Sequence, residues 1–227
     1  MASQTRFIDI PKSLTDVVEE KIRQMIMSGE LQFGQQITET RLSEMFNLSK
    51  TPIREALLRL SAGERLVEIK PRTGTFIFSL TEKEVANISS FRIMLEQEAI
   101  RSSMQSTSHA VLLAELGKNL NASESLLEKE NLPRYRQLDS NFHSVFLRHA
   151  ENPYLIDAYK VISTKVWAMR NRLSFSPDYV RQSIEEHAGI VCTLMAGEVE
   201  KACKLVADHI NNGFTAQSLR SLTTTRS

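Results

Sequence analysis

The stretch VEIKPRTGTFIF at residues 67–78 stands apart from the rest of this chain, whose apolar residues recur with helical spacing. Two β-prone runs flank a Lys-Pro-Arg-Thr-Gly turn, and this pattern predicts a β-hairpin. Clear strand signals are otherwise missing from the sequence. We therefore expect a mainly α-helical protein that contains one small β element.

Three helical segments precede the hairpin. The first is expected from Ser13 to about Gly29, the second over about 39–46, and the third from Thr51-Pro52 to about Ala62. The third has the clearest start, because a threonine cap followed by proline at the first helical position is a strong helix signal. The order helix, helix, short turn, helix, hairpin indicates a winged helix-turn-helix, which we place at residues 1–78.

A second domain is expected over residues 79–222. It begins with the capping box TEKE at 81–84 and continues with about six or seven helical segments. The breaks between them fall near residues 106–108, 131–133, 152–153, 174–177 and 197. Because no strand pattern competes, we predict an all-α antiparallel helical bundle joined by short loops. The last residues, 223–227, are expected to form a disordered tail.

The third helical segment has an apolar face and a polar face. The apolar face is expected to pack on the core through Ile53, Leu57, Leu58 and Leu60. The polar face, at or near the surface, offers Lys50, Thr51, Arg54 and Arg59. The N-terminal part of such a helix enters the major groove of DNA, where Arg reads guanine O6 and N7 and where Lys and Thr hold phosphates.

Basic residues are concentrated in one region of the chain, residues 50–72. The whole chain has a net charge of +1, so total charge gives no sign of nucleic-acid binding. Residues 50–72, however, carry six basic side chains against three acidic ones. The hairpin turn adds Arg72, and the small Gly74 beside it permits a close approach to a DNA backbone. The alternative is an ordinary solvated amphipathic helix with routine surface charge.

A second group of polar residues lies on apolar helix faces of the second domain. Asp139 and His143 are four residues apart beside Phe142, while His187 and His209 each stand in an apolar series with i, i+3, i+4 spacing. All four side chains should therefore point inward. A buried carboxylate is costly unless it meets a cation, and one Asp with three His suits a divalent transition metal. A metal-free buried polar network is the alternative.

These ligands do not by themselves indicate an enzyme. The sequence has no His-Glu-x-x-His motif and no Ser or Cys in a recognisable nucleophile motif, so we expect no catalytic activity. A metal can instead anchor an anionic ligand, and this use needs a basic residue nearby. Arg92 and Arg170 are the candidates for effector binding, although Arg92 also has an ordinary partner in Glu96, four residues later.

Other features place the protein in a reducing compartment. The two cysteines, Cys192 and Cys203, both fall inside expected helices and give no disulfide framework. No apolar run approaches the roughly 20 residues that span a membrane. The N-terminal MASQTRFIDIPK lacks the apolar core of a signal peptide. We therefore expect a cytoplasmic protein without a membrane partner, and we expect His109 and His149 on its surface.

Taken together, the motifs resemble the GntR family of transcription regulators, FadR subfamily, with an FCD-type ligand domain. The resemblance covers almost the whole chain. The first domain matches in ITETRLSEMFNLSKTPIREALLRL and PRTGTFI. The second matches in RIMLEQEA (92–99), LDSNFHSVFLRHAENPYL (138–155), EEHAGIV (185–191) and ADHINNG (207–213).

The resemblance implies a homodimer that binds double-stranded DNA at a palindromic operator, most often as a repressor, and senses a small carboxylate metabolite. The family's metal pattern falls on Asp139, His143, His187 and His209. Its DNA-reading positions fall on Lys50, Thr51, Arg54 and Gly74. Lys50 departs from the more frequent arginine, and because lysine is a point charge without a planar fork, phosphate contact is the expectation there.

The ligand set is compatible with more than one metal, and the motifs with more than one function. Zinc is the first choice, while nickel and manganese also tolerate three imidazoles and a carboxylate. One alternative keeps the DNA binding but makes the metal purely structural, or makes the metal itself the signal. A more distant alternative is a metalloenzyme with an attached DNA-binding module.

Overall fold

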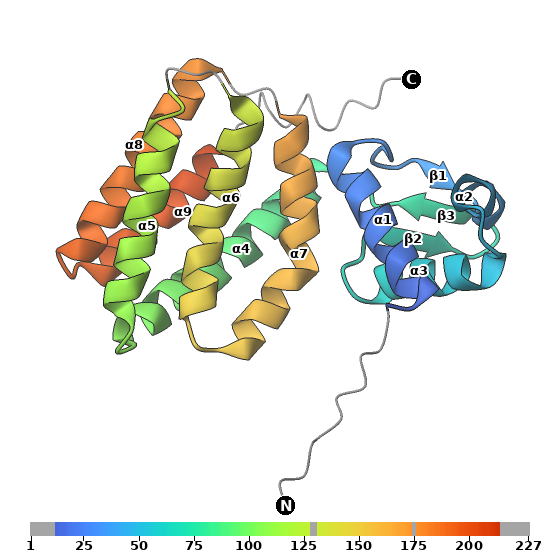
Figure 1. The fold of residues 1–227 in the computed structure, drawn as a ribbon, viewed down its shortest axis with the longest axis horizontal. Coiled ribbons are helices and arrows are strands. Elements are labelled where there is room, and N and C mark those ends of the chain that lie inside the picture. Colours follow the sequence, from blue (N-terminus) through green and yellow to red (C-terminus); the bar gives the residue numbers. More distant parts are fainter. Residues whose placement is uncertain (1–11, 128–130, 174–175, 214–227) are drawn as a thin grey trace, which may run out of the picture. The chain divides into compact units, whose positions relative to one another are not determined.

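The computed structural model describes residues 12–127, 131–173 and 176–213, and the predicted tail at 223–227 lies outside them. The chain divides into two compact units, Met1–Phe78 and Ser79–Ser227. Within the described residues there are nine helices and three short strands (Figure 1). The prediction of a mainly α-helical protein with a small β element is confirmed.

The N-terminal unit has the element order of a winged helix-turn-helix. Its elements are α1 (Leu14–Ser28), β1 (Gln36–Ile37), α2 (Glu39–Phe46), α3 (Lys50–Ala62), β2 (Val67–Lys70) and β3 (Gly74–Ile77). The predicted hairpin is β2 and β3, which pair antiparallel from Val67 opposite Ile77 to Lys70 opposite Gly74. Strand β1 adds a third strand on the far side of β3. It was not predicted, because two residues are too few to show an alternating pattern.

Local capping explains where α1 and α3 begin. Ser13 and Asp16 form the reciprocal capping box at the start of α1. Helix α3 begins at Lys50 after the N-cap Ser49, so the cap lies two residues earlier than expected and the prediction of Thr51 as the cap was wrong. Pro52 then occupies the third helical position. It is tolerated there because the N–H groups of the first turn have no partner within a helix.

The core of the N-terminal unit lies between α1, α2, α3 and the sheet. Its buried side chains include Val18, Ile22, Ile26, Leu42, Ile53, Leu57, Leu60 and Ile77. Leu58 was expected among them but is 53% exposed. The buried face of α3 is formed by Ile53, Leu57 and Leu60. Because successive residues of a helix are rotated by about 100°, Leu58 points away from this face.

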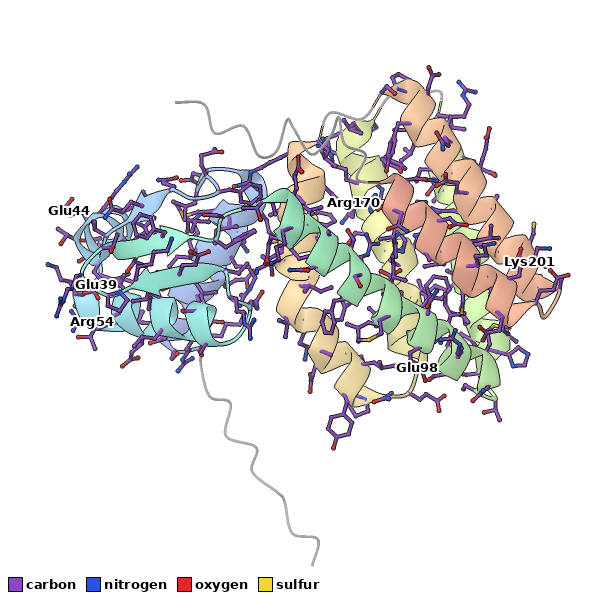
Figure 2. The ribbon with its side chains drawn as sticks, turned by 180° about the vertical axis from the view of Figure 1, so that it is seen from behind. Glu39, Glu44, Arg54, Glu98, Arg170 and Lys201 are labelled. Atoms are coloured by element: carbon purple, nitrogen blue, oxygen red, sulfur yellow. The ribbon has the colours of Figure 1, made fainter. Side chains whose placement is uncertain are left out.

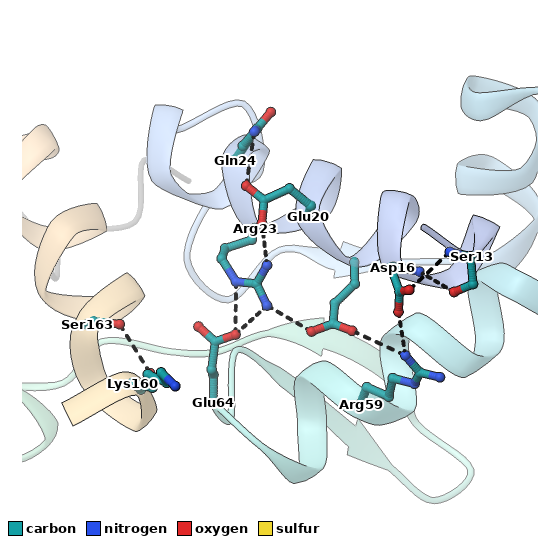
Figure 3. Close-up of polar contacts among 10 residues, drawn as sticks. Ser13, Asp16, Glu20, Arg23, Gln24, Arg59, Glu64, Lys160 and Ser163 are labelled. Atoms are coloured by element: carbon teal, nitrogen blue, oxygen red, sulfur yellow. Dashed lines mark hydrogen bonds and ion pairs between the residues drawn. The ribbon is translucent and has the colours of Figure 1, made fainter. Parts of the chain in front are cut away.

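Ion pairs join α1 to α3 and to the loop that follows α3 (Figure 3). Arg23 Nη2 donates to Glu64 Oε1 at 2.6 Å, and Arg59 Nη1 donates to Asp16 Oδ1 at 2.8 Å. Both pairs are partly exposed, so solvent screening keeps their contribution to stability small. Arg59 therefore serves the packing of α1 on α3, although the sequence placed it with the outward-facing basic residues.

The C-terminal unit is helical throughout its described residues. Its helices are α4 (Glu82–Gln105), α5 (His109–Glu124), α6 (Leu132–His149), α7 (Pro153–Arg172), α8 (Pro177–Met195) and α9 (Val199–Asn212). Asn131, Asn152 and Ser176 cap α6, α7 and α8, and a proline follows within the first turn of each helix. Among the described residues, no helix combines the length and apolar character that crossing a bilayer requires.

Packing within the C-terminal unit brings α6, α8 and α9 around one apolar centre. Helix α4 packs against α6, α7 and α9, while α8 packs against α5 and α9. The shared core includes Leu112, Phe142, Phe146, Ile190, Leu194 and Val206. Polar residues on the inner faces of these helices are consequently cut off from water.

Gly74 offers a test of the hairpin geometry. Its φ of +131° lies in a region that side chains rarely adopt, and an added Cβ would stand 2.6 Å from Gln36 Nε2. We expect Gly74→Ala to lower the free energy of unfolding of the N-terminal unit by about 1–3 kcal/mol, measured by urea unfolding. Gly189→Ala, in helix α8 with open space around it, should instead be neutral or stabilising. Equal stability of Gly74→Ala and wild type would contradict this backbone geometry.

Candidate metal centre and DNA-facing surface

Three helices of the C-terminal unit bring four polar side chains to one point. Helix α6 contributes Asp139 and His143, α8 contributes His187, and α9 contributes His209. Their exposed fractions are 1%, 1%, 1% and 3%, respectively. One ligand atom from each residue lies within 4.8 Å of the others. The four residues selected from the sequence are therefore neighbours in space.

Hydrogen bonds fix the orientation of two of the imidazoles. His143 Nδ1 donates to Glu96 Oε2 at 2.7 Å, and His209 Nδ1 donates to Glu186 Oε2 at 2.7 Å. The assignment of the hydrogens follows from the carboxylates, which only accept when ionised. In both rings Nε2 then carries a lone pair.

The Nε2 atoms of the three histidines converge. The His143 and His209 Nε2 atoms are 3.2 Å apart, and the His187 and His209 Nε2 atoms are also 3.2 Å apart. Burial lowers the pKa of His143 and of His187 well below the usual value, so an added proton is disfavoured. Two lone pairs at this separation repel each other unless a cation lies between them. Neutral imidazoles that converge in this way match the donor set of a transition metal.

The two carboxylate oxygens of Asp139 face different neighbours. Oδ1 lies 3.8 Å from His187 Nε2 and 3.4 Å from the Tyr135 hydroxyl, while Oδ2 contacts Arg170 Nη2. Burial raises the pKa of Asp139, but the charge of Arg170 and further nearby cations outweigh it, and the net pKa is lowered. The ionised carboxylate thus keeps one oxygen on the side of the histidines.

Glu96 and Glu186 form an outer layer around the candidate ligands. Glu96 is fully buried and accepts from Arg92 Nε at 2.6 Å as well as from His143. Carboxylates that hold the second ring nitrogen of a ligating histidine are a usual part of metal sites. The roles of Glu96 and Glu186 beside the histidines could not be predicted from the sequence. Each hydrogen bond joins two different helices, so it leaves no local spacing pattern.

The two candidate effector-binding arginines are inside the C-terminal unit. Arg92 on α4 is 2% exposed and pairs with Glu96, the ordinary i, i+4 partner that the sequence also offered. Arg170 on α7 is 5% exposed and pairs with Asp139. A single carboxylate therefore lies between each arginine and a histidine. Glu96 lies between Arg92 and His143, and Asp139 lies between Arg170 and His187.

A pocket of about 220 Å³ lies close to the same group. It is lined by Leu126, Leu127, Asn131, Leu132, Tyr135, Pro177, Val180 and Arg181. Tyr135 links the pocket to the candidate ligands, since its hydroxyl bonds Asp139. The lining is mainly apolar and includes one cation, Arg181, that sequence reasoning did not single out.

The other two histidines lie apart from this group. His109 is exposed at the start of α5, as expected. His149 was expected on the surface but is partly buried, because its Nε2 bonds Glu115 Oε2 at 2.9 Å.

The predicted DNA-binding residues occupy α3 and the turn of the hairpin. Lys50, Thr51, Arg54 and Arg72 are exposed. Gly74 is half-buried and its place is explained by backbone conformation and by the nearness of Gln36. Arg54 pairs with Glu39 of α2, and Figure 2 shows the two labelled side chains together. This pair was not anticipated, because the residues are 15 positions apart.

Comparison with known proteins identifies the families that the two parts of the chain match. Residues 14–77 match the family described as bacterial regulatory proteins, gntR family, and residues 87–212 match the FCD domain. The chain is 29% identical over 195 residues to the uncharacterized HTH-type transcriptional regulator YdhC of Bacillus subtilis, with 85% of each chain covered. It is 27% identical to the gluconate operon transcriptional repressor of Bacillus subtilis, over 64% of this chain and 59% of that protein.

Solved structures share the fold. The Escherichia coli protein McbR/YncC superposes with a TM-score of 0.70 at 22% identity, covering 89% of this chain and 95% of that one. A GntR transcriptional regulator from Rhodococcus sp. RHA1 superposes with a TM-score of 0.71 at 16% identity, covering 95% and 100%. The two named relatives from Bacillus subtilis are transcription regulators. The chain belongs to the GntR family of transcription regulators and carries an FCD domain.

Proposed function

We propose that this regulator binds a divalent transition metal through Asp139, His143, His187 and His209 and uses it to sense a small carboxylate. The observation that carries the proposal is the convergence of the three Nε2 atoms, 3.2 Å apart in two pairs, with the lone pairs of His143 and His209 facing each other. A metal-free network would leave at least one of these nitrogens without a hydrogen-bond donor. A bound metal would supply a Lewis acid that anchors an anion.

Charge balance favours an anionic effector. Next to the histidines, the buried interior holds two cations, Arg92 and Arg170, which are paired with two anions, Glu96 and Asp139. A divalent metal would add two positive charges. The single negative charge of Glu186, which is partly exposed, offsets only part of them. Because net charge in a dry interior is costly, a carboxylate in contact with this region is stabilised. The name of one relative points the same way, since gluconate is a sugar carboxylate.

The choice of metal rests on the ligands. Three imidazoles and a carboxylate favour zinc, and nickel or manganese accept the same set. Arg170 and Arg92 hold the carboxylates of Asp139 and Glu96 in place and contribute positive charge for the effector. Tyr135 and Arg181 supply a polar edge to the adjacent pocket. A purely structural metal, or direct metal sensing, remains the second candidate function, because the ligands themselves are fully enclosed.

On the DNA side, we propose that α3 lies in the major groove. Arg54 would read guanine, Lys50 and Thr51 would hold phosphates, and Arg72 with Gly74 would bring the hairpin turn to the backbone. The proposed regulator binds a palindromic operator as a homodimer and acts as a repressor. Each half-site then receives one such helix. Effector binding would shift the population between DNA-competent and incompetent states through residues 79–84. A cytoplasmic location stays a prediction.

Metal binding is tested by removing one ligand. We expect His143→Ala to lose bound metal, because three remaining ligands hold it weakly and Glu96 loses its imidazole partner. Metal content per chain is measured by elemental mass spectrometry after gel filtration. His149→Ala, on the same helix but bonded to Glu115, should keep the wild-type content. Full metal content in His143→Ala would contradict the assigned site.

Dimerisation on DNA is tested by mass. We expect native mass spectrometry to give two chains on one duplex that the protein has selected from a random-sequence pool. The selected sequences should contain an inverted repeat, because a two-fold dimer presents the same helix to both half-sites. One chain per duplex, or selected sites without symmetry, would refute the dimer.

Effector class is tested by thermal unfolding of metal-loaded protein with sugar acids, hydroxy acids, amino acids and dicarboxylates. A ligand at ~100 times its dissociation constant adds roughly 2.7 kcal/mol, which raises the midpoint by several degrees. We expect at least one class to do so, and we expect the shift to vanish on chelation. If no carboxylate acts while chelation alone lowers the midpoint strongly, the metal is structural or is itself the signal.

A further inference from the structure

Arg54 and Glu39 form a two-point ion pair within the helix-turn-helix. Arg54 Nε donates to Glu39 Oε1 at 2.8 Å, and Nη2 donates to Oε2 at 2.7 Å. Glu39 is the first residue of α2, and Arg54 lies in the second turn of α3. The contact therefore joins the two helices, and the labelled side chains meet at one edge of the N-terminal unit (Figure 2).

The pair determines which edge of the guanidinium is occupied. A guanidinium presents its five N–H donors in a fixed fork. Glu39 takes the edge formed by Nε and Nη2, and Nη1 has no hydrogen-bond partner within the described part of the chain. The Arg54 side chain is 64% exposed. The edge formed by Nη1 and Nη2 is thus open to a ligand with two acceptors.

Glu39 is itself anchored independently of DNA. It follows the N-cap Thr38, whose hydroxyl accepts from Arg41 N, so its negative charge stands at the positive end of the α2 dipole. The hydrogen bond from Arg54, with the charges of Arg54 and Lys50, lowers the pKa of Glu39 despite some desolvation. The carboxylate stays ionised and can hold Arg54 before DNA arrives.

We propose that Glu39 is a positioning residue for sequence reading, holding Arg54 by one edge so that the other edge meets O6 and N7 of a guanine. The proposal rests on the proposed contact of Arg54 with DNA. A side chain that is already held loses less conformational freedom on binding. Its benefit is confined to sites with a guanine in the right place, so Glu39 raises specificity rather than general affinity.

The experiment compares full-length metal-loaded variants on two duplexes. One is the duplex that wild type selects from a random-sequence pool, and the other is a shuffled duplex of equal length and composition. The variants are Glu39→Gln, Arg54→Ala, the double variant, and Glu44→Gln. Glu44 is an exposed residue of the same helix with no side-chain ion pair among the described residues. It controls for the loss of one negative charge near DNA.

We expect Arg54→Ala to lower the ratio of specific to non-specific affinity by about 5- to 150-fold. Glu39→Gln should lower the same ratio by about 3- to 30-fold, while Glu44→Gln leaves it unchanged. In the Arg54→Ala background, Glu39→Gln should have no further effect. Non-specific affinity near the wild-type value shows that each variant has kept its folded DNA-binding unit.

Three results would overturn the inference. The ratio for Glu39→Gln could equal that of Glu44→Gln, which would reduce Glu39 to a general negative charge. It could rise, which would mean that Glu39 masks Arg54 from DNA. It could also fall equally with and without Arg54, which would show that Glu39 acts elsewhere. If Arg54→Ala itself leaves the ratio unchanged, the proposed DNA contact fails, and that failure is distinct from the other three.

Discussion

Three imidazole nitrogens that meet in a dry interior impose the main constraint on the C-terminal unit. Their Nε2 atoms lie 3.2 Å apart in two pairs, and burial disfavours the added proton that could separate the lone pairs of His143 and His209. The helices that carry them, α6, α8 and α9, must hold this geometry through packing around Phe142, Ile190 and Val206. A cation at the centre would stabilise such an arrangement, and under the proposed function folding of the bundle would then depend on metal binding.

The constraint spreads outward through carboxylates. Glu96 fixes His143 and at the same time holds Arg92, while Asp139 faces His187 with one oxygen and Arg170 with the other. Removing one partner of such a buried pair leaves the other charge buried without a partner. This lowers the free energy of unfolding by about 3–5 kcal/mol. Helices α4 and α7 are thereby linked to the histidine group, although neither supplies one of its histidines. Under the proposed function, an anion bound in this region would change the charge balance for all of these helices together.

Much of this arrangement could be predicted from the sequence. Helical spacing placed Asp139, His143, His187 and His209 on inner faces, and the predicted breaks at 131–133 and 152–153 fall where α6 and α7 begin. Contacts between distant segments escaped prediction, because Glu96, Glu186 and the Arg54–Glu39 pair have no local pattern. Leu58 was misplaced because its apolar character suggested burial, while helical rotation carries it out of the stripe. Strand β1 is held by pairing with β3 and not by a pattern of its own.

The proposed metal ion lies among Asp139, His143, His187 and His209. Anomalous diffraction at the metal absorption edge, from crystals of metal-loaded protein, locates such an ion. We expect one strong peak per chain within ~2.0–2.2 Å of the Nε2 atoms of His143, His187 and His209 and of an Asp139 oxygen. A peak coordinated by other residues, or no peak there while the three rings keep their separation, would refute the metal site.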